Sequence, residues 1–437
     1  MRKQALKQKK TITKYEVAIT KRSIIIAAAA VTLTSITASA AGSGFSGEDR
    51  LITAAAAPHD NKYTEIKWGG DIKRENCGVP FVDGERLLLP CGNKLLSLDE
   101  KTGTELSSAD LPENCSQEFS GTKLGDSLLV PTEKGVALLD SDGLRLKSSR
   151  SFDGSIASDC SILDKLGYFA VEYDDSWEFL CIDLDSEELQ TVWSCEVPEK
   201  PSTAAVQGDN VIFAAGDSLY THHYKNTSET VRIPVGKTIT GSPFATEYAV
   251  FFSTEDGNAA KLRLNSDGTL EEDTLTFCRI GDSPSSPLSW NGRLYVAAAD
   301  GFYVLDNLNM EVSYVLNDIK GGCTPQVHYG SGPYIYTVAP REDRWAVYCI
   351  RDMDDETEPT YAILAQMEDY SRGAFCASAA GTLYFLDAVG RVYALTIAPF
   401  DVLGLIIRLV VLLALMALVF IWFKKMADRR AALRPKY

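Results

Sequence analysis

The chain has 437 residues, of which 45% are hydrophobic, and this is enough apolar material for a large core. Its formal net charge at pH 7 is −16. Residues 1–40 contribute +7 and residues 424–437 contribute +5, which leaves −28 for residues 41–423. Because so acidic a segment repels nucleic acid and anionic lipid surfaces, we exclude nucleic acid as a partner.

Residues 1–40 have the order of features found in secretory signals. Eight Lys or Arg and one Glu come first, up to Arg22, and an uncharged apolar stretch follows over 23–36. Ala38-Ser39-Ala40 then matches the small-residue pattern of cleavage sites. We predict a signal peptide at 1–40 and a linker at 41–61, which has no periodicity. An uncleaved signal anchor is the alternative.

A short phrase then recurs eight times at intervals of 40 to 45 residues. Clear copies read LLSLDEKTGTEL (95–106), VALLDSDGLRL (136–146) and FYVLDNLNM (302–310). Aligned on the residue after the last apolar one, the copies fall at Asp99, Asp140, Asp183, His223, Asn265, Asp306, Arg351 and Thr396. A fixed period of this length, in segments that alternate like strands, predicts a β-propeller.

Each copy is expected to form four strands joined by polar turns, with glycine in the first turn because tight hairpins need positive φ. The eighth copy ends after its third strand, and KYTEIKWGGDI (62–72) precedes the first copy without belonging to one. The predicted fold is therefore all-β: an eight-bladed propeller over 62–399 whose last blade is closed by an N-terminal strand. Closure would remove exposed sheet edges.

The phrase L-x-x-L-D-x-x-T-G-x-x-L, formed by Leu95, Leu98, Asp99, Thr102, Gly103 and Leu106, resembles the PQQ-like repeat of quinoprotein-type eight-bladed propellers. The resemblance covers roughly 63–398. That superfamily holds quinone-dependent dehydrogenases and also non-enzymatic scaffolds such as the outer-membrane assembly lipoprotein BamB. It implies that Asp99 and Thr102-Gly103 organise a turn. Its enzymes carry two adjacent cysteines over the cofactor, and no two cysteines are adjacent here, so we expect no cofactor.

The C-terminal region is apolar and then basic. Val402 to Phe423 is 22 residues long with one charge, Arg408, which is long enough for a transmembrane helix. Residues 424–437 carry six basic residues and one acidic residue, which predicts a cytoplasmic tail. We therefore expect a single-pass protein of the cell membrane, with its propeller extracellular and its C-terminus cytoplasmic.

All ten cysteines lie between residues 77 and 376, and an even number in an exported domain favours disulfides. Cys181 and Cys195 lie symmetrically about the turn DSEE, so we predict a cross-strand bridge between them. Buried thiols without bridges are the alternative. No C-x-x-C occurs, and the adjacent His222 and His223 would point to opposite faces of a strand, so no metal site is predicted.

No sequence motif of a catalytic site is present, and we predict no catalytic residue. Carboxylates instead recur in the second turn of the copies, and these turns should share one face of the propeller. They are Glu133, Asp174, Asp175, Asp217, Glu255, Asp256, Asp300, Glu342, Asp343 and Asp387. They predict an electronegative rim for a basic protein partner, a cationic ligand or calcium. Ordinary solubilising turns are the alternative.

The sequence therefore favours a non-catalytic cell-surface propeller that acts as a scaffold or receptor and binds a protein or ligand at the cell envelope. The alternative is a quinone-dependent enzyme or one with a site in the propeller channel, either an oxidoreductase or a hydrolase.

Overall fold

The structure is a computed structural model of the whole chain. It describes residues 52–53, 64–69, 77–83, 86–225, 230–265, 267–328, 334–352, 358–368, 375–377, 382–386, 391–397, 412 and 415–423. The chain divides into two compact units, residues 1–397 and residues 398–437. The predicted signal peptide, most of the linker and the basic tail lie outside the described residues.

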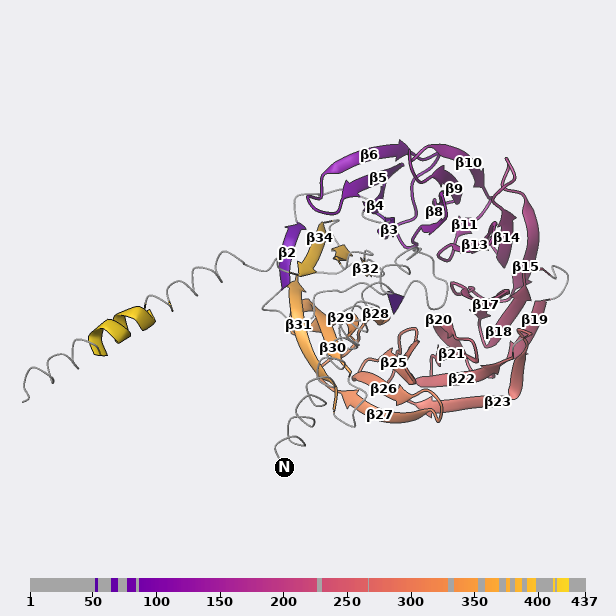
Figure 1. The fold of residues 1–437 in the computed structure, drawn as a ribbon. Helices are drawn as coiled ribbons and strands as arrows, with labels where there is room; N and C mark the ends of the chain where they lie inside the picture. Colours follow the sequence, from indigo (N-terminus) through magenta and orange to yellow (C-terminus); the bar gives the residue numbers. More distant parts are fainter. Residues whose placement is uncertain are drawn as a thin grey trace, which may run out of the picture. The chain divides into compact units, whose positions relative to one another are not determined.

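The first unit is a β-propeller whose sheets are arranged around a central axis (Figure 1). Seven of its blades are each formed by one continuous stretch of chain. Their four principal strands, from the axis outward, are as follows. They are β3(Phe81–Asp83), β4(Arg86–Cys91), β5(Lys94–Asp99) and β6(Glu105–Asp110); β7(Thr122–Leu124), β8(Ser127–Pro131), β9(Gly135–Asp140) and β10(Leu146–Ser151); and β12(Ser161–Leu163), β13(Leu166–Glu172), β14(Trp177–Asp183) and β15(Thr191–Val197), with β11(Ser155–Ile156) also paired to β13.

The next four blades follow the same order. They are β16(Ala205–Gln207), β17(Asn210–Ala215), β18(Ser218–His223) and β19(Thr230–Pro234); β20(Ile239–Ala245), β21(Ala249–Thr254), β22(Asn258–Leu264) and β23(Leu270–Arg279); β24(Leu288–Trp290), β25(Arg293–Ala297), β26(Phe302–Asp306) and β27(Glu311–Leu316); and β28(Gln326–His328), β29(Tyr334–Arg341), β30(Arg344–Arg351) and β31(Thr360–Met367). β1(Ile52–Thr53) adds to β28 in parallel.

A composite sheet lies between the last continuous blade and the first (Figure 1). It contains β32(Phe375–Ala377), β33(Leu383–Leu386) and β34(Val392–Ile397) together with β2(Thr64–Gly69) from the N-terminal side. β2 pairs antiparallel with β34, Thr64 opposite Ile397, so the predicted closure by an N-terminal strand is confirmed.

The predicted fold class requires a correction in the number of blades. The described residues contain seven blades of continuous chain and not eight, because the eighth repeat supplies only three strands, β32 to β34, to the composite sheet. The sequence period gives the number of repeat copies. A blade of continuous chain also needs a fourth, outer strand from the same copy, and the eighth copy has none.

The repeat alignment is confirmed to within one residue, and Thr396 is the last residue but one of β34. Asp99, Asp140, Asp183, His223, Asp306 and Arg351 are each the last residue of the third strand of their blade, and Asn265 directly follows β22. The first-turn glycines have the positive φ that tight hairpins require, 55° at Gly125 and 57° at Gly208.

The turn after the third strand is organised by its aspartate, as the repeat resemblance implied. Asp99 Oδ1 accepts hydrogen bonds from the backbone N–H groups of Lys101 (3.0 Å) and Thr102 (2.8 Å) and from the Thr102 hydroxyl (2.8 Å). These bonds, the Thr102 hydroxyl first, hold the pKa of Asp99 below its ordinary value. Gly103 completes the turn with φ 69°.

The core lies between neighbouring blades. Phe179 of β14 stacks on Phe213 of β17 with ring centroids 3.9 Å apart. At the point of closure, Leu96 and Leu98 of β5 share one apolar cluster with Val392 of β34. Apolar burial of this kind, repeated around the axis, supplies most of the stabilisation of the propeller.

The second unit contains a short helix, which Figure 1 draws in yellow, over the described residues 415–423. Among the residues that the structure describes, no helix is long and apolar enough to cross a membrane. The transmembrane helix predicted over Val402 to Phe423 is therefore not confirmed, since its described residues form only this short helix and the rest of the segment lies outside the described residues. The apolar composition of the segment led to the longer prediction.

Candidate binding face

The second turns of the blades lie on one face of the propeller, together with the links that lead from one blade to the next. This follows from antiparallel pairing, because the second and fourth strands of a blade run in the same direction and therefore end at the same face. Hydrogen bonds join the second turns to these links: Glu133 N–H donates to Asn114 O at 2.9 Å, and Ile280 N–H donates to Gly257 O at 2.9 Å. We call this surface the second-turn face.

The structure places the predicted carboxylates on the second-turn face. Between the second and third strands of their blades, and exposed, lie Glu133, Asp174, Asp175, Asp217, Glu255, Asp256, Asp300, Glu342 and Asp343. Asp387 lies outside the described residues. The first blade contributes no acid, because its second turn is Gly92-Asn93.

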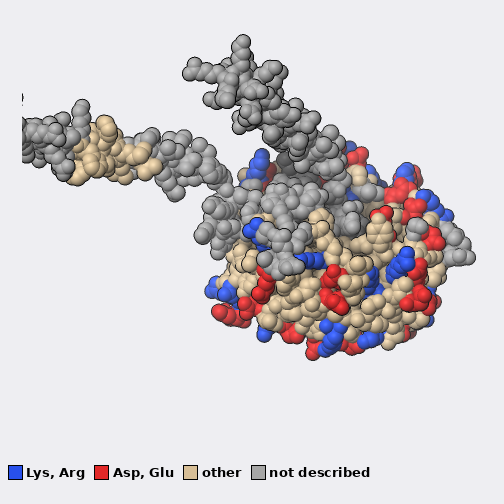
Figure 2. Space-filling view, turned by 60° about the horizontal axis from the view of Figure 1, so that its bottom comes forward, with Lys and Arg blue, Asp and Glu red and all other residues tan. Residues whose placement is uncertain are grey.

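Cations from neighbouring strands neutralise part of this rim. Asp256 pairs with Lys237 at 2.6 Å, and Asp217 pairs with Arg232 at 3.4 Å. The hydrogen bond from Lys237 is the main reason that the pKa of Asp256 falls to about 2. Figure 2 shows acidic and basic side chains interspersed on the face that it presents. The sequence did not reveal these pairs, because their partners are 15 to 19 residues away.

Two carboxylates of the β13–β14 turn are not neutralised in this way. Asp174 and Asp175 are exposed and form no ion pair within the described part of the chain. Beside them, Trp177 is half-buried and lies 6.0 Å from the Lys200 Nζ atom, which is also 5.5 Å from the Phe119 ring. Aromatic faces and carboxylates together attract cationic groups. The ammonium group of Lys200 occupies the position between the rings in the structure, and the sector of Asp174, Asp175, Trp177 and Phe119 is a candidate for recognising a positively charged side chain.

The aromatic members of this sector were not predicted. Phe119 comes from the link between β6 and β7, whereas Trp177 begins β14 two residues after Asp175. The tryptophan next to an acidic turn was the only signal in the sequence.

On the opposite face, buried carboxylates join neighbouring blades. Asp83 forms ion pairs with Arg86 and with Lys123 of the next blade, and it accepts a hydrogen bond from Ser141 at 2.6 Å. Burial alone would raise the pKa of Asp83, but the hydrogen bonds from Lys123 and Ser141 lower it below the ordinary value. Asp83 therefore acts as a charged clamp between two blades.

Asp352 forms a second clamp of the same kind. It pairs with Arg293 of the preceding blade and accepts a hydrogen bond from Tyr295 Oη at 2.7 Å. Although Asp352 begins an acidic run in the sequence, only 3% of the residue is exposed.

The two adjacent histidines point to opposite faces of β18, as predicted. His222 is buried and stacks on Trp193 with ring centroids 3.9 Å apart, whereas His223 is partly exposed. Burial lowers the pKa of His222 to about 4. Among the described residues, no three His, Cys, Asp or Glu side chains converge in a way that could hold a metal ion.

The predicted bridge between Cys181 and Cys195 is wrong. Cys181 lies opposite Trp193 and Cys195 lies opposite Phe179, so the two thiols are diagonal neighbours on their strands. Diagonal positions are about 7 Å apart or more, whereas a disulfide needs Cβ atoms within about 4.5 Å. The β14–β15 turn is centred on DSEE, but Cys181 lies four residues before Asp185 whereas Cys195 lies seven residues after Glu188, so the two cysteines do not face each other.

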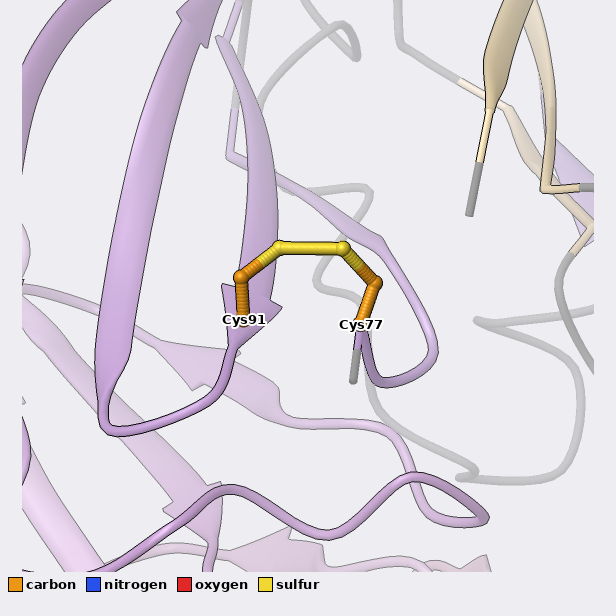
Figure 3. Close-up of a disulfide and its surroundings, with 2 residues drawn as sticks. All are labelled: Cys77 and Cys91. Carbon is orange, nitrogen blue, oxygen red and sulfur yellow. A yellow bond between two sulfur atoms is a disulfide. The ribbon is translucent and has the colours of Figure 1, made fainter. Parts of the chain in front are cut away.

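The disulfide that does form joins Cys77 to Cys91, with Cα atoms 4.1 Å apart (Figure 3). The two residues face each other directly across an isolated antiparallel bridge. Cys91 ends β4, so this bond attaches the entry of the first blade to its second strand.

The fold and this face define the chain as a β-propeller with a mixed-charge surface of turns and links. No protein-family model matches the sequence, and no curated protein matches it either.

Solved structures match over most of the chain. The quinohemoprotein alcohol dehydrogenase ADHIIG from Pseudomonas putida HK5 has a TM-score of 0.55 at 8% identity, covering 81% of this chain and 80% of its own. The computationally designed Ika8 protein has a TM-score of 0.55 at 9% identity, covering 80% and 99%. BamB from Moraxella catarrhalis has a TM-score of 0.47 at 15% identity, covering 79% and 95%. At these identities the likeness to the two structures with a TM-score of 0.55 shows the fold alone, and it agrees with the propeller that the repeat phrase predicts.

Proposed function

We propose that this chain is a non-catalytic scaffold that binds a basic segment of a protein partner at the cell envelope through its second-turn face. The observation that carries the proposal is the sector of Asp174 and Asp175 beside Trp177 and Phe119. There, two exposed carboxylates without ion pairs within the described residues adjoin two aromatic rings already arranged around an ammonium group.

The surrounding charge supports the same partner chemistry. Residues 41–423 carry a net charge of −28, which speeds the approach of a basic partner and opposes an acidic one. A rigid disc of packed blades also presents its turns at fixed positions, which suits recognition through several contacts. The expected extracellular location stays a prediction from the N- and C-terminal sequence.

The test is crosslinking in intact cells, followed by purification through a C-terminal tag and mass spectrometry. The double variant D174N/D175N should lose the partner. The matched control is E187Q/E188Q, because Glu187 and Glu188 are also adjacent and exposed but lie on the opposite face of the same blade. Equal recovery of a partner by both variants would remove this sector from the proposal.

An enzyme remains the second candidate, because a quinohemoprotein dehydrogenase shares the fold. It is distinguished by the absorbance of the purified protein. A bound quinone chromophore that is present in stoichiometric amount would favour the enzyme over the scaffold.

A further inference from the structure

On the second-turn face, one ammonium group lies between two aromatic rings. The Nζ atom of Lys200 is 5.5 Å from the centre of the Phe119 ring and 6.0 Å from the centre of the Trp177 ring. At these distances the electron-rich face of an aromatic ring attracts a cation. The structure therefore contains a site for a cation, and the group that fills it is a side chain of the same chain.

Three separate segments of the chain bring these residues together. Phe119 belongs to the link between β6 and β7, Trp177 is the first residue of β14, and Lys200 belongs to the link between β15 and β16. Phe119 and Trp177 are half-buried, whereas Lys200 is exposed. Part of each ring is thus open to solvent and can be reached by a ligand.

The backbone on both sides of the site is fixed by the fold. Ser120, next to Phe119, donates its N–H to Asp159 Oδ1 at 2.5 Å, and the Thr203 hydroxyl donates to Asp159 Oδ2 at 3.1 Å. Asp159 therefore connects the link that carries Phe119 to the link that carries Lys200. The start of β14 is paired with strands on both of its sides. The two rings should keep their places whether or not a cation lies between them.

The ammonium group of Lys200 is held much less firmly than the rings. It forms no ion pair or hydrogen bond within the described part of the chain. Lys225 and Lys237 also lie over rings, but each is paired with a carboxylate at 2.6 Å, from Asp209 and Asp256 respectively. Because a cation–π contact at an exposed site is weak, Lys200 can leave its position at little cost.

We infer that Lys200 is an internal occupant of this site, and that a lysine of the partner binds between the rings when Lys200 moves out. An external ammonium group can bind only those molecules in which the position between the rings is open, so Lys200 weakens the apparent affinity. The exposed Asp174 and Asp175, in the turn before Trp177, add attraction for a basic segment. This inference rests on the proposed function, because it concerns the regulation of the same sector.

The test is fluorescence anisotropy of a dye-labelled acetyl-Lys-Lys-Lys-amide peptide, titrated with the full chain in a mild non-ionic detergent. Lys200→Ala should bind the peptide roughly two- to fivefold more tightly than the wild type, the range expected for one cation–π contact at an exposed site. The matched control is Lys134→Ala. Lys134 is also exposed on the second-turn face, in the β8–β9 turn, so its removal measures the effect of a lost surface charge alone.

A second comparison assigns the gain to the rings. The double variants K200A/W177L and K200A/F119L each lack one ring, and both should lose the tighter binding. Circular dichroism reports whether each variant folds. If one ring variant does not fold, the other decides, and if neither folds, the comparison of Lys200→Ala with Lys134→Ala decides alone. A peptide with three acetylated lysines should bind none of the proteins, because it has no ammonium group.

The inference is overturned if Lys200→Ala binds the trilysine peptide no more tightly than Lys134→Ala, or if neither variant binds it. It is equally overturned if folded ring variants keep the gain, since surface charge would then account for the binding. These results differ from a failure of the proposed function. Tighter binding of the peptide by Lys200→Ala, together with full recovery of a cellular partner by D174N/D175N, would keep the internal occupant and remove this sector from the scaffold proposal.

Discussion

His222 gives the sharpest test of how this propeller responds to acid. The imidazole is 1% exposed, stacks on Trp193 at 3.9 Å and lies 6.3 Å from the Tyr168 ring. Its Nδ1 atom has no hydrogen-bond partner among the described residues. Protonation would place a charge in this apolar contact between two blades, and burial is accordingly the main reason that the pKa falls from 6.5 to about 4.

The sign of the effect on stability follows from proton binding. Between pH 6.5 and pH 4 the unfolded chain holds a proton on His222 while the folded protein does not, so stability rises with pH in this window and is lost as pH falls. A depression from 6.5 to about 4 corresponds to about 3 kcal/mol when complete, and to about 2 kcal/mol between pH 7 and pH 4.5.

The measurement is urea unfolding of the wild type and of His222→Phe at pH 7 and at pH 4.5. Phenylalanine keeps the stack on Trp193 and cannot be protonated, whereas all other titrating groups are shared and cancel in the difference. The wild type should lose about 2 kcal/mol more than the variant on acidification. Equal losses in the two proteins would refute the assignment of an acid-sensitive contact to His222.

The remaining predictions concern the stability of the ring. Cys91→Ser removes a disulfide that spans 14 residues and should lower the free energy of unfolding by about 3 kcal/mol. The difference between wild type and variant should vanish in reductant. A difference that persists in reductant would mean that the variant loses packing and not the disulfide. Asp83→Asn leaves Arg86 and Lys123 without their buried carboxylate and should cost about 3 kcal/mol in urea unfolding, whereas Asp142→Asn, on an exposed turn, should cost almost nothing. Gly103→Val forces a β-branched residue to φ 69° and should cost about 2 kcal/mol by the same measurement, with no change at exposed Lys101→Ala. Removal of residues 62–72 deletes β2 and should cause aggregation and rapid proteolysis, so a monomeric and protease-resistant product would contradict closure of the ring.

Local sequence determined the repeating features of this protein. A strand alternates with period two, and a turn needs particular residues at particular φ values, so both are written in short stretches. This is why the positions of Asp99 and its counterparts, the first-turn glycines and the carboxylates of the second turns could be predicted. The closure by β2 could also be predicted, because one strand was left over at one end and one was missing at the other.

Tertiary structure alone decided the contacts between strands and blades. In the β14–β15 hairpin Cys181 lies opposite Trp193 and not opposite Cys195, and a direct bridge brings Cys77 to Cys91. The sequence could not distinguish the exposed Asp174 from the buried Asp352, because burial depends on which blade packs beside each turn. For the same reason the sequence did not reveal the cations that neutralise Asp217 and Asp256 or the stack of His222 on Trp193. Sequence patterns describe what each segment prefers, whereas charge, acidity and access at a site depend on neighbours that only folding brings together.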